Sequence, residues 1–221
     1  MRKNIFILNL ILLALLLAGD VCYILLGGLW LKALTSLMFV VIGLINLIYA
    51  LKVKKGNMKF AIILFIGLVF AMAGDIVLNI HFIGGAILFA VGHVFFYVAY
   101  NFIEKFKLID LLYTACVFVP ALAILLFVQI LNYGSVLMQI ICIFYTLVIS
   151  FMVGKAISIY VRKKTLANLF VLLGSIFFFF SDAMLLFAQF SNVSVAFGVL
   201  CLATYYPAEF MLAHSVYQQA K

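Results

Sequence analysis

The stretch KVKKGNMKFAIILFIGLVFAMAGDIVLNI, residues 52–80, decides the fold. It begins with a cluster of lysines and continues as an apolar run, residues 59–80, in which Asp75 is the only acidic residue. A helix needs about 20 predominantly apolar residues to cross the hydrocarbon core of a bilayer. Lysine and arginine next to such a run favour the cytoplasmic side. The stretch therefore predicts a transmembrane helix that leaves the cytoplasm at its basic end and has one carboxyl group within the membrane.

The whole chain has the composition of a membrane protein. Of its 221 residues, 70% are hydrophobic and 9% are charged, whereas a typical soluble domain has roughly 25% charged residues. We predict an all-α fold, a single transmembrane domain over residues 1–221 that forms a bundle of about eight membrane-spanning helices. The predicted spans are 5–26, 33–51, 59–80, 83–103, 108–128, 136–161, 165–187 and 195–217. The first is too long for the apolar part of a signal peptide and is expected to remain as a helix.

The basic residues predict the orientation of this bundle. They lie before the first span and in every second turn, whereas the turns 79–84, 132–135 and 189–194 contain no lysine or arginine. The positive-inside rule then places both termini in the cytoplasm, with Lys32 as the one basic residue on the opposite side. We predict a multi-pass protein of the cell membrane, and the bacterial inner membrane is the favoured location. The formal net charge of +8 reflects topology and does not indicate a nucleic-acid partner.

Four of the six acidic residues fall within predicted spans: Asp20, Asp75, Asp182 and Glu209. An ionisable side chain at the centre of a spanning helix costs at least ~2.5 kcal/mol, so it requires a reason. The three aspartates lie on spans that run outward, at similar distances from their cytoplasmic ends, and each follows a small residue. We predict that they share one level in the outer half of the membrane, near Lys32.

Carboxyl groups that lie close together in an apolar medium cannot all be ionised. One of them then holds a proton, which places a usable acid beside a usable anion. The alternative is purely structural, in which the aspartates hydrogen-bond between helices and hold the bundle together. Depth alone does not separate the two hypotheses, because it does not show that the helices are neighbours.

Two features of the fourth and seventh spans concern packing. Gly85, Gly92 and Gly174 should permit close contact between helices, because they have no side chain to hold the backbones apart. His93 lies near the middle of its span, with Tyr97 one turn later on the same face. A lone buried histidine is more often a packing residue than a functional one, so both roles stay open here.

Other residues are expected to play structural parts. The four cysteines lie singly within apolar runs and are predicted to pack as small apolar residues. Lys155 lies near a cytoplasmic helix end, where its amine can reach water. Asp110 flanks a cytoplasmic turn, and His214 is expected to contact water or headgroups near a helix end. Pro120 and Pro207 should interrupt their helices, since each removes one backbone donor and kinks the helix.

Several segments resemble motifs of one family. In order along the chain they are Lys32-Ala33-Leu34-Thr35, Gly74-Asp75-Ile76-Val77-Leu78, Gly92-His93-Val94-Phe95-Phe96-Tyr97, Ser181-Asp182 and Tyr205-Tyr206-Pro207-Ala208-Glu209. The ordered set resembles the YhhN-like lysoplasmalogenase family from about residue 30 to 215. Ala33 replaces the proline of the family's Lys-Pro-Leu-Thr motif, and Glu209 stands where the family has glutamine. Asp20 matches no family motif and rests on the depth argument.

The resemblance implies a membrane hydrolase that cleaves the vinyl ether bond of lysoplasmalogens, releasing a fatty aldehyde and a glycerophospho-headgroup. Vinyl ethers hydrolyse by protonation on carbon followed by attack of water, which suits one protonated carboxyl beside one carboxylate. The predicted catalytic pair is Asp75 and Asp182, without assignment of acid and base. The predicted substrate-binding residues are Lys32, His93, Tyr97, Tyr206, Glu209, Asn79 and Asp20.

The expected partners are a lysophospholipid substrate and membrane lipid, with Lys32 meeting the lipid phosphate. No metal or other cofactor is expected, and the sequence does not define the oligomeric state. Two alternatives remain open. Carboxyl groups at one depth also form the proton relays of carriers, although matched broken helices in two halves of the chain are not evident. The chain could also bind lipid without any chemistry.

Overall fold

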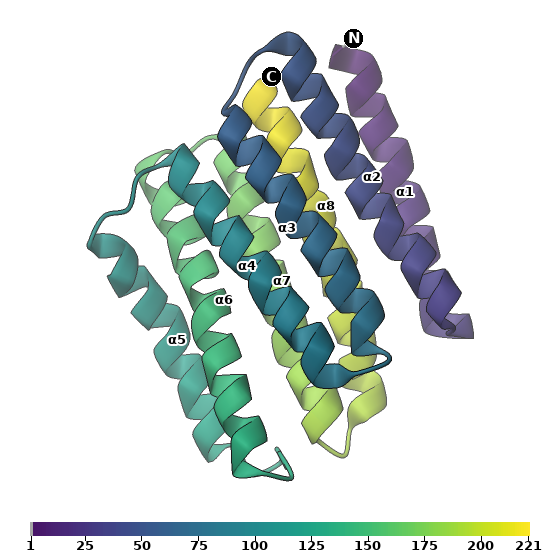
Figure 1. Ribbon diagram of the computed structural model, residues 1–221, viewed down its shortest axis with the longest axis vertical. Coiled ribbons are helices and arrows are strands. Elements are labelled where there is room, and N and C mark those ends of the chain that lie inside the picture. The colour runs from purple at the N-terminus through teal and green to yellow at the C-terminus, as the bar shows by residue number, and fades with distance from the viewer. Residues whose placement is uncertain (1) are drawn as a thin grey trace.

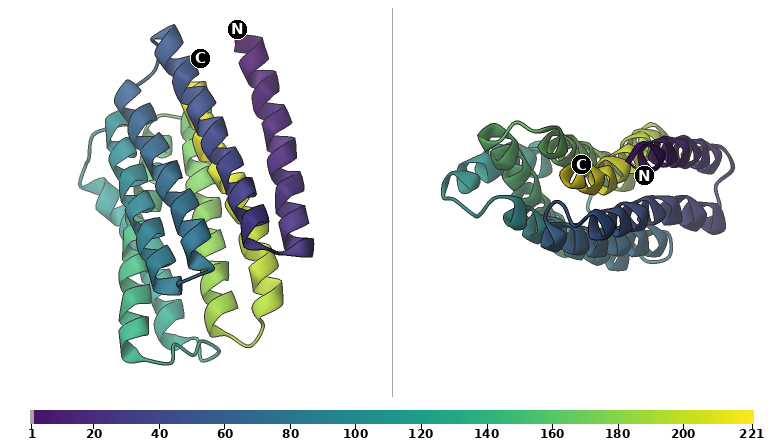
Figure 2. Two further views of the ribbon diagram at one scale, coloured as in Figure 1. Left: turned by 45° about the vertical axis from the view of Figure 1, so that its right-hand side comes forward. Right: turned by 90° about the horizontal axis from the view of Figure 1, so that it is seen from above.

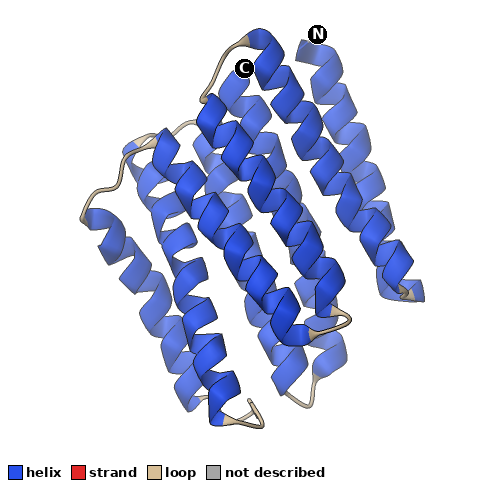
Figure 3. Cartoon of the chain, in the orientation of Figure 1, coloured by secondary structure: helices blue, strands red, loops and turns tan. Residues whose placement is uncertain are grey.

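The computed structural model describes residues 2–221 and, within them, all side chains except that of Ser194. Its elements are α1 (Arg2–Leu26), α2 (Leu29–Val53), α3 (Met58–Leu78), α4 (Phe82–Ile103), α5 (Ile109–Phe127), α6 (Val136–Arg162), α7 (Leu166–Phe190) and α8 (Ser194–Ala220). The described chain contains helices and no strands (Figure 3). All eight helices are long and apolar enough to cross a membrane, so the protein is a multi-pass membrane protein.

The predicted spans are confirmed in number and order. The largest difference between a predicted and an observed end is in α2, which begins at Leu29 rather than at residue 33. Helices α5 and α8 continue through Pro120 and Pro207, so the two prolines do not end them. A proline removes only one backbone donor, and the neighbouring helices hold the rest of the hydrogen-bonding pattern in place.

The helices form two layers (Figure 2). One layer contains α2, α3 and α4, and the other contains α1, α8, α7 and α6, with α5 packed on α6 at one end. Between the layers, α8 contacts α2 and α3, and α6 contacts α4. Both termini lie at the same end of the bundle, together with the α2–α3, α4–α5 and α6–α7 connections (Figure 1). We call this the basic end, because these connections carry lysine or arginine.

Glycines allow the helices to approach closely, as the sequence predicted. A Cβ atom added at Gly85 of α4 would lie 2.5 Å from Leu78 Cα in α3. One added at Gly174 of α7 would lie 3.1 Å from the carbonyl oxygen of Ala208 in α8. Gly92 is more loosely enclosed, since its added Cβ would lie 3.3 Å from the nearest atom. Close backbone contact replaces the side-chain interdigitation that larger residues would provide.

Gly85→Ala should therefore lower the stability of the bundle. The new methyl group would meet backbone atoms of Leu78, which cannot move without shifting α3 against α4. Overpacking of this kind typically costs ~1–3 kcal/mol. Gly198→Ala is the matched control, because a Cβ at Gly198 meets nothing within 4 Å. Thermal unfolding of the purified protein in detergent checks the prediction, and equal midpoints for the two variants would contradict it.

Asp110 and Lys155 are not surface residues, contrary to the sequence-based interpretation. Lys155 of α6 is fully buried, and its Nζ donates to Asp110 Oδ2 over 2.7 Å. Asp110 also accepts from Ser158 Oγ, from Arg162 Nη2 at 3.1 Å and from the backbone N–H of Lys107 at 3.0 Å. The carboxylate thus joins the first turn of α5 to the last turns of α6, which explains why two charges are buried there.

The interpretation of His214 as an exposed residue is wrong for a similar reason. His214 of α8 is buried and lies against Phe210 and Phe170. Its Nδ1 is 3.3 Å from Asn9 Oδ1 in α1, and its Nε2 is 2.8 Å from Gln218 Nε2. Polar side chains therefore link α1 to the rest of the bundle near the basic end.

Candidate functional site within the membrane

Asp75 is the centre of a hydrogen-bonded cluster between α2, α3 and α8. Its Oδ1 forms an ion pair with Lys32 Nζ at 2.9 Å, and both side chains are almost completely buried. Its Oδ2 accepts from Ser36 Oγ at 2.5 Å and from Tyr206 Oη at 3.2 Å. Three donors, one of them an ammonium group, surround this carboxyl, which is the environment of a carboxylate.

Lys32 and Ser36 reach Asp75 together because they lie one turn apart on the same face of α2. Tyr206 approaches from α8, where Phe39 of α2 packs against its ring. On the other side of Asp75, the side chain of Asn79 donates to the Asp75 carbonyl oxygen at 2.9 Å. Tyr23 of α1 completes the group, with its Oη 3.4 Å from Asn79 Oδ1 and its ring 5.4 Å from Lys32 Nζ.

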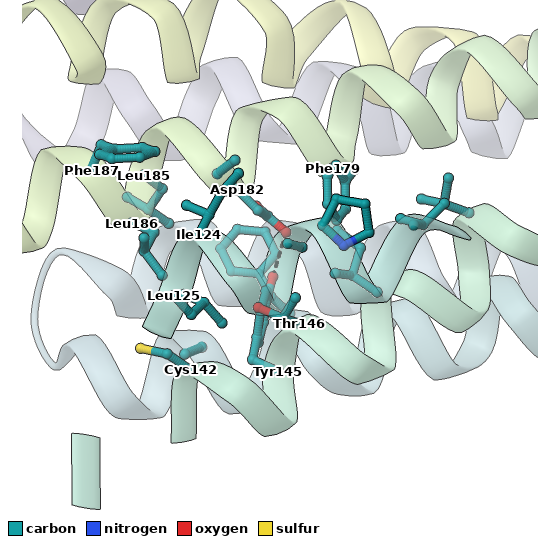
Figure 4. A pocket seen from close by; sticks show the side chains of 18 of the residues that line it. Ile124, Leu125, Cys142, Tyr145, Thr146, Phe179, Asp182, Leu185, Leu186 and Phe187 are labelled. Atoms are coloured by element: carbon teal, nitrogen blue, oxygen red, sulfur yellow. Dashed lines mark hydrogen bonds between the residues drawn. The ribbon is translucent and has the colours of Figure 1, made fainter. Parts of the chain in front are cut away.

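Asp182 of α7 has a different set of partners. Tyr145 of α6 donates to Asp182 Oδ2 at 2.6 Å, and His93 Nε2 of α4 lies 3.1 Å from the same oxygen. His93 Nε2 is also 2.9 Å from Tyr145 Oη, so the three side chains form a triangle. Figure 4 shows Tyr145 pointing to Asp182. A tyrosine hydroxyl and a histidine ring are its partners, and no lysine or arginine forms an ion pair with it among the described residues.

Asp75 and Asp182 line one polar cavity of about 230 Å³. Its polar lining consists of Tyr23, Lys32, Asp75, Asn79, Ser181, Asp182, Gln189, Cys201 and Tyr205. The cavity therefore receives one ion pair, a second carboxyl and several neutral donors and acceptors from α1, α2, α3, α7 and α8. Such convergence of polar groups within an apolar bundle is typical of a binding or catalytic site.

An apolar groove of about 410 Å³ passes the carboxyl of Asp182. It runs between α4, α5, α6 and α7, and its lining is apolar except near Asp182, Tyr145 and Thr146 (Figure 4). Five residues line both spaces: Leu78, Phe82, Phe89, Asp182 and Leu185. Asp182 thus lies where the polar cavity and the apolar groove meet. The volume of the groove falls within the usual range of small-molecule sites, about 300–1,000 Å³.

The other predicted site residues lie in three kinds of place. Tyr206 and His93 do not line the polar cavity but hydrogen-bond to the carboxyls that do. Asp20 and Glu209 are buried, and Asp20 Oδ1 and both Glu209 carboxyl oxygens have no hydrogen-bond partner among the described residues. Tyr97 lines neither the polar cavity nor the apolar groove, and its ring lies 5.9 Å from that of Phe151 on α6.

The sequence analysis did not single out Ser36, Tyr145 or Tyr23. Ser36 had a usable pattern, since it follows Lys32 by one helical turn. Tyr145 lies in the apolar run of α6 and had no such pattern; only its hydroxyl group distinguishes it from the surrounding residues. Within residues 2–221, no group of three or more His, Cys, Asp or Glu side chains is placed to hold a metal ion.

Fold and site together define a class of protein. It is a polytopic helical membrane protein with two carboxyl groups at a polar cavity inside the bundle, next to an apolar groove. The model of the YhhN family matches residues 29–216. The chain therefore belongs to the YhhN family, which is the lysoplasmalogenase family, and the resemblance stated from the sequence is confirmed. No curated protein matches the chain, and no solved structure does.

The family match covers all the residues around the two carboxyls except Tyr23 and Asp20, which lie on α1 before residue 29. Asp20 was predicted from depth alone, and it lies outside the matched part of the chain. Helix α1 packs against α2 and α8, and its Tyr23 reaches Asn79 at the C-terminus of α3, so α1 covers one side of the polar cavity from outside the family region.

Proposed function

We propose that this protein hydrolyses the vinyl ether bond of lysoplasmalogens, releasing a fatty aldehyde and a glycerophospho-headgroup. The observation that carries the proposal is the position of Asp182, with an ion pair and polar groups on one side and an apolar groove on the other. The vinyl ether bond of a lysoplasmalogen lies between its polar headgroup and its hydrocarbon chain. A carboxyl at such a boundary is placed to react with that bond. Family membership supports the same activity.

The two carboxyls have environments that suit different roles. Asp75 accepts hydrogen bonds from Lys32, Ser36 and Tyr206, so it acts as the carboxylate. Asp182 is held by a tyrosine hydroxyl and a histidine ring and forms no ion pair with a lysine or arginine among the described residues, and we assign the transferred proton to it. Two titratable groups with contrasting environments are the usual basis for assigning an acid and a base.

The reaction begins when Asp182 transfers its proton to the vinyl carbon farther from the ether oxygen. The carbon bound to oxygen becomes an oxocarbenium centre, and Asp182 becomes a carboxylate that stabilises the positive charge. Water then adds to that carbon and gives its proton to Asp182, which forms a hemiacetal and restores the acid. Collapse of the hemiacetal moves its hydroxyl proton to the departing glycerol oxygen and yields the aldehyde and the headgroup alcohol.

The remaining residues orient these groups. Tyr145 and His93 fix the carboxyl of Asp182 by holding one of its oxygens, which leaves the other free for substrate. Lys32 uses one N–H on Asp75, and an ammonium group has three, so it can also meet the lipid phosphate. Ser36 and Tyr206 hold Asp75 and thereby the position of Lys32.

The direct test is aldehyde release by the purified protein in detergent from a defined lysoplasmalogen. The matched substrate is the corresponding alkyl ether lysolipid, which has the same headgroup and chain length but no double bond. Aldehyde from the vinyl ether alone supports the proposal, because only the vinyl ether can be protonated on carbon. If a well-folded preparation releases no aldehyde, the proposal is contradicted and the carrier or lipid-binding function is favoured.

Lys32→Ala should weaken substrate binding more than it slows turnover. Loss of a charged hydrogen bond to phosphate costs about 1.5–3 kcal/mol, which corresponds to roughly a tenfold or greater increase in KM. Lys32→Arg keeps the positive charge and should lie closer to the wild type. Steady-state kinetics on the same lysoplasmalogen separate KM from kcat. An unchanged KM with a reduced kcat would show that Lys32 serves Asp75 alone.

A further inference from the structure

The polar cavity lies at one particular end of the bundle. Among its lining residues, Asn79 caps the C-terminus of α3, Gln189 lies one residue before the end of α7, and Tyr23 lies in the last turn of α1. These helix ends are opposite the basic end, where both termini lie (Figure 1). The cavity is therefore in the half of the bundle that faces away from the basic connections.

Lys32 is an exception to the distribution of basic residues. The thirteen other lysines and arginines of the fourteen in the chain lie in the termini, in the connections at the basic end or in the helical turns next to it. Lys32 lies in the first turn of α2, at the far end, and lines the polar cavity. Its ammonium group forms an ion pair with Asp75 and has further N–H donors, which makes it the one basic side chain at this end that can meet an anionic headgroup in the cavity.

The apolar groove continues from the cavity toward the basic end. Leu125 and Phe190 lie at its far end, and Ile157 and Cys116 lie toward the basic end. Near its basic end the groove offers no polar group for a headgroup: the neighbouring charges of Asp110 and Lys155 are buried in their own ion pair. A lysolipid whose chain lies in the groove can place its headgroup at one end only, in the polar cavity.

The geometry points to a lysolipid taken from the membrane leaflet that faces away from the cytoplasm, with its headgroup in the polar cavity and its single chain in the apolar groove. The headgroup product is released on the non-cytoplasmic side, and the aldehyde stays in the membrane. This inference rests on the proposed function and on the cytoplasmic position of the basic end. It adds the leaflet, the orientation of the substrate and the side of product release.

Orientation is established first with two single-cysteine markers. The native cysteines are replaced by alanine, and either Lys55→Cys, in the α2–α3 connection, or Asn192→Cys, in the α7–α8 connection, is added; both positions are exposed. In sealed right-side-out vesicles, a membrane-impermeant thiol reagent should label Asn192→Cys and not Lys55→Cys. The reverse pattern would place the basic end outside and overturn the inference.

The side of product release is then measured with the wild-type protein. Sealed vesicles of known orientation receive a lysoplasmalogen with a choline headgroup in both leaflets, and the water-soluble glycerophosphocholine is measured in the medium and in the lumen. Right-side-out vesicles should release it to the medium, and inverted vesicles should retain it until detergent is added. Release on the cytoplasmic side overturns the inference while leaving the proposed function intact. Absence of turnover in detergent instead overturns the proposed function, and the inference with it.

A second readout does not depend on turnover. Cys201 lines the polar cavity, and Cys22, Cys116 and Cys142 can be replaced by alanine to leave it as the sole cysteine. An impermeant thiol reagent should reach Cys201 only from the side that labels Asn192→Cys, and an alkyl ether lysolipid should protect Cys201 but not Asn192→Cys. Labelling from the cytoplasmic side, or from neither side, contradicts an opening away from the cytoplasm.

The position of the chain is tested with two alanines of α5. Ala121 lines the apolar groove, whereas Ala123 is exposed and lies outside it. Ala121→Phe should lower kcat/KM for a long-chain lysoplasmalogen by about tenfold or more, with a smaller effect on a short-chain one. Ala123→Phe should change neither value. Equal effects of Ala121→Phe on both chain lengths would show that the chain does not lie in this groove.

Discussion

Asp182→Asn should lower turnover by about 100- to 10,000-fold, the contribution that a general acid typically makes. An amide can accept the hydrogen bond of Tyr145 but can neither give a proton to the vinyl carbon nor stabilise the cation that forms. Asp75→Asn should have an effect of similar size, because it removes the charge that balances Lys32 beside the reacting bond. In both variants the loss should fall on kcat far more than on KM.

Three comparisons make this test decisive. Tyr97→Phe removes the hydroxyl group of a residue that lines neither the polar cavity nor the apolar groove, so it should leave turnover unchanged. The wild type should run measurably slower in heavy water than in light water, because proton transfer to carbon is slow. Thermal unfolding shows whether each variant is folded. Near-normal turnover in both folded asparagine variants would make the carboxyls structural and contradict the proposed mechanism.

Asp110→Asn should destabilise the protein by about 3–5 kcal/mol, the usual cost of breaking a buried ion pair. Lys155 is fully buried and would keep its charge without the carboxylate that balances it. The same substitution weakens the contacts of Ser158 and Arg162 with the first turn of α5. Since α5 packs mainly on α6, its attachment to the bundle depends on this junction, and so does one wall of the apolar groove.

A double-mutant comparison isolates the ion pair. Asp110→Asn combined with Lys155→Met removes both charges, and it should regain much of the lost stability because no unpaired charge remains buried. Lys105→Met is the control and should have little effect, because Lys105 is an exposed lysine in the α4–α5 connection. The measurement is unfolding in detergent. Equal stability of Asp110→Asn and the wild type would show that the pair is not held in the folded state.

Much of the candidate site followed from the sequence, and particular residues show why. Asp75 and Asp182 stood out because a carboxyl within a spanning helix is costly, and both line the polar cavity. Lys32 stood out because it breaks the charge pattern, and the structure pairs it with Asp75. Tyr145 and Tyr23 were missed because hydroxyl groups in apolar helices have little cost and leave no strong pattern, whereas Ser36 was missed although it follows Lys32 by one helical turn. Tyr97 was included because it shares a face with His93, yet it lines neither the polar cavity nor the apolar groove, and its ring packs against Phe151 of α6.

The sequence by itself determined the membrane spans, their order and the segregation of basic residues to alternate connections. These properties depend on how each segment partitions between lipid and water. The sequence of that segment alone therefore contains the information. Only the tertiary structure decided which faces meet. The helices are apolar all round, and lipid is as apolar as the interior, so hydropathy does not fix the rotation of a helix about its axis. For that reason the burial of Asp110 with Lys155, the Tyr145–His93–Asp182 triangle and the junction of cavity and groove became visible only when the helices were packed together.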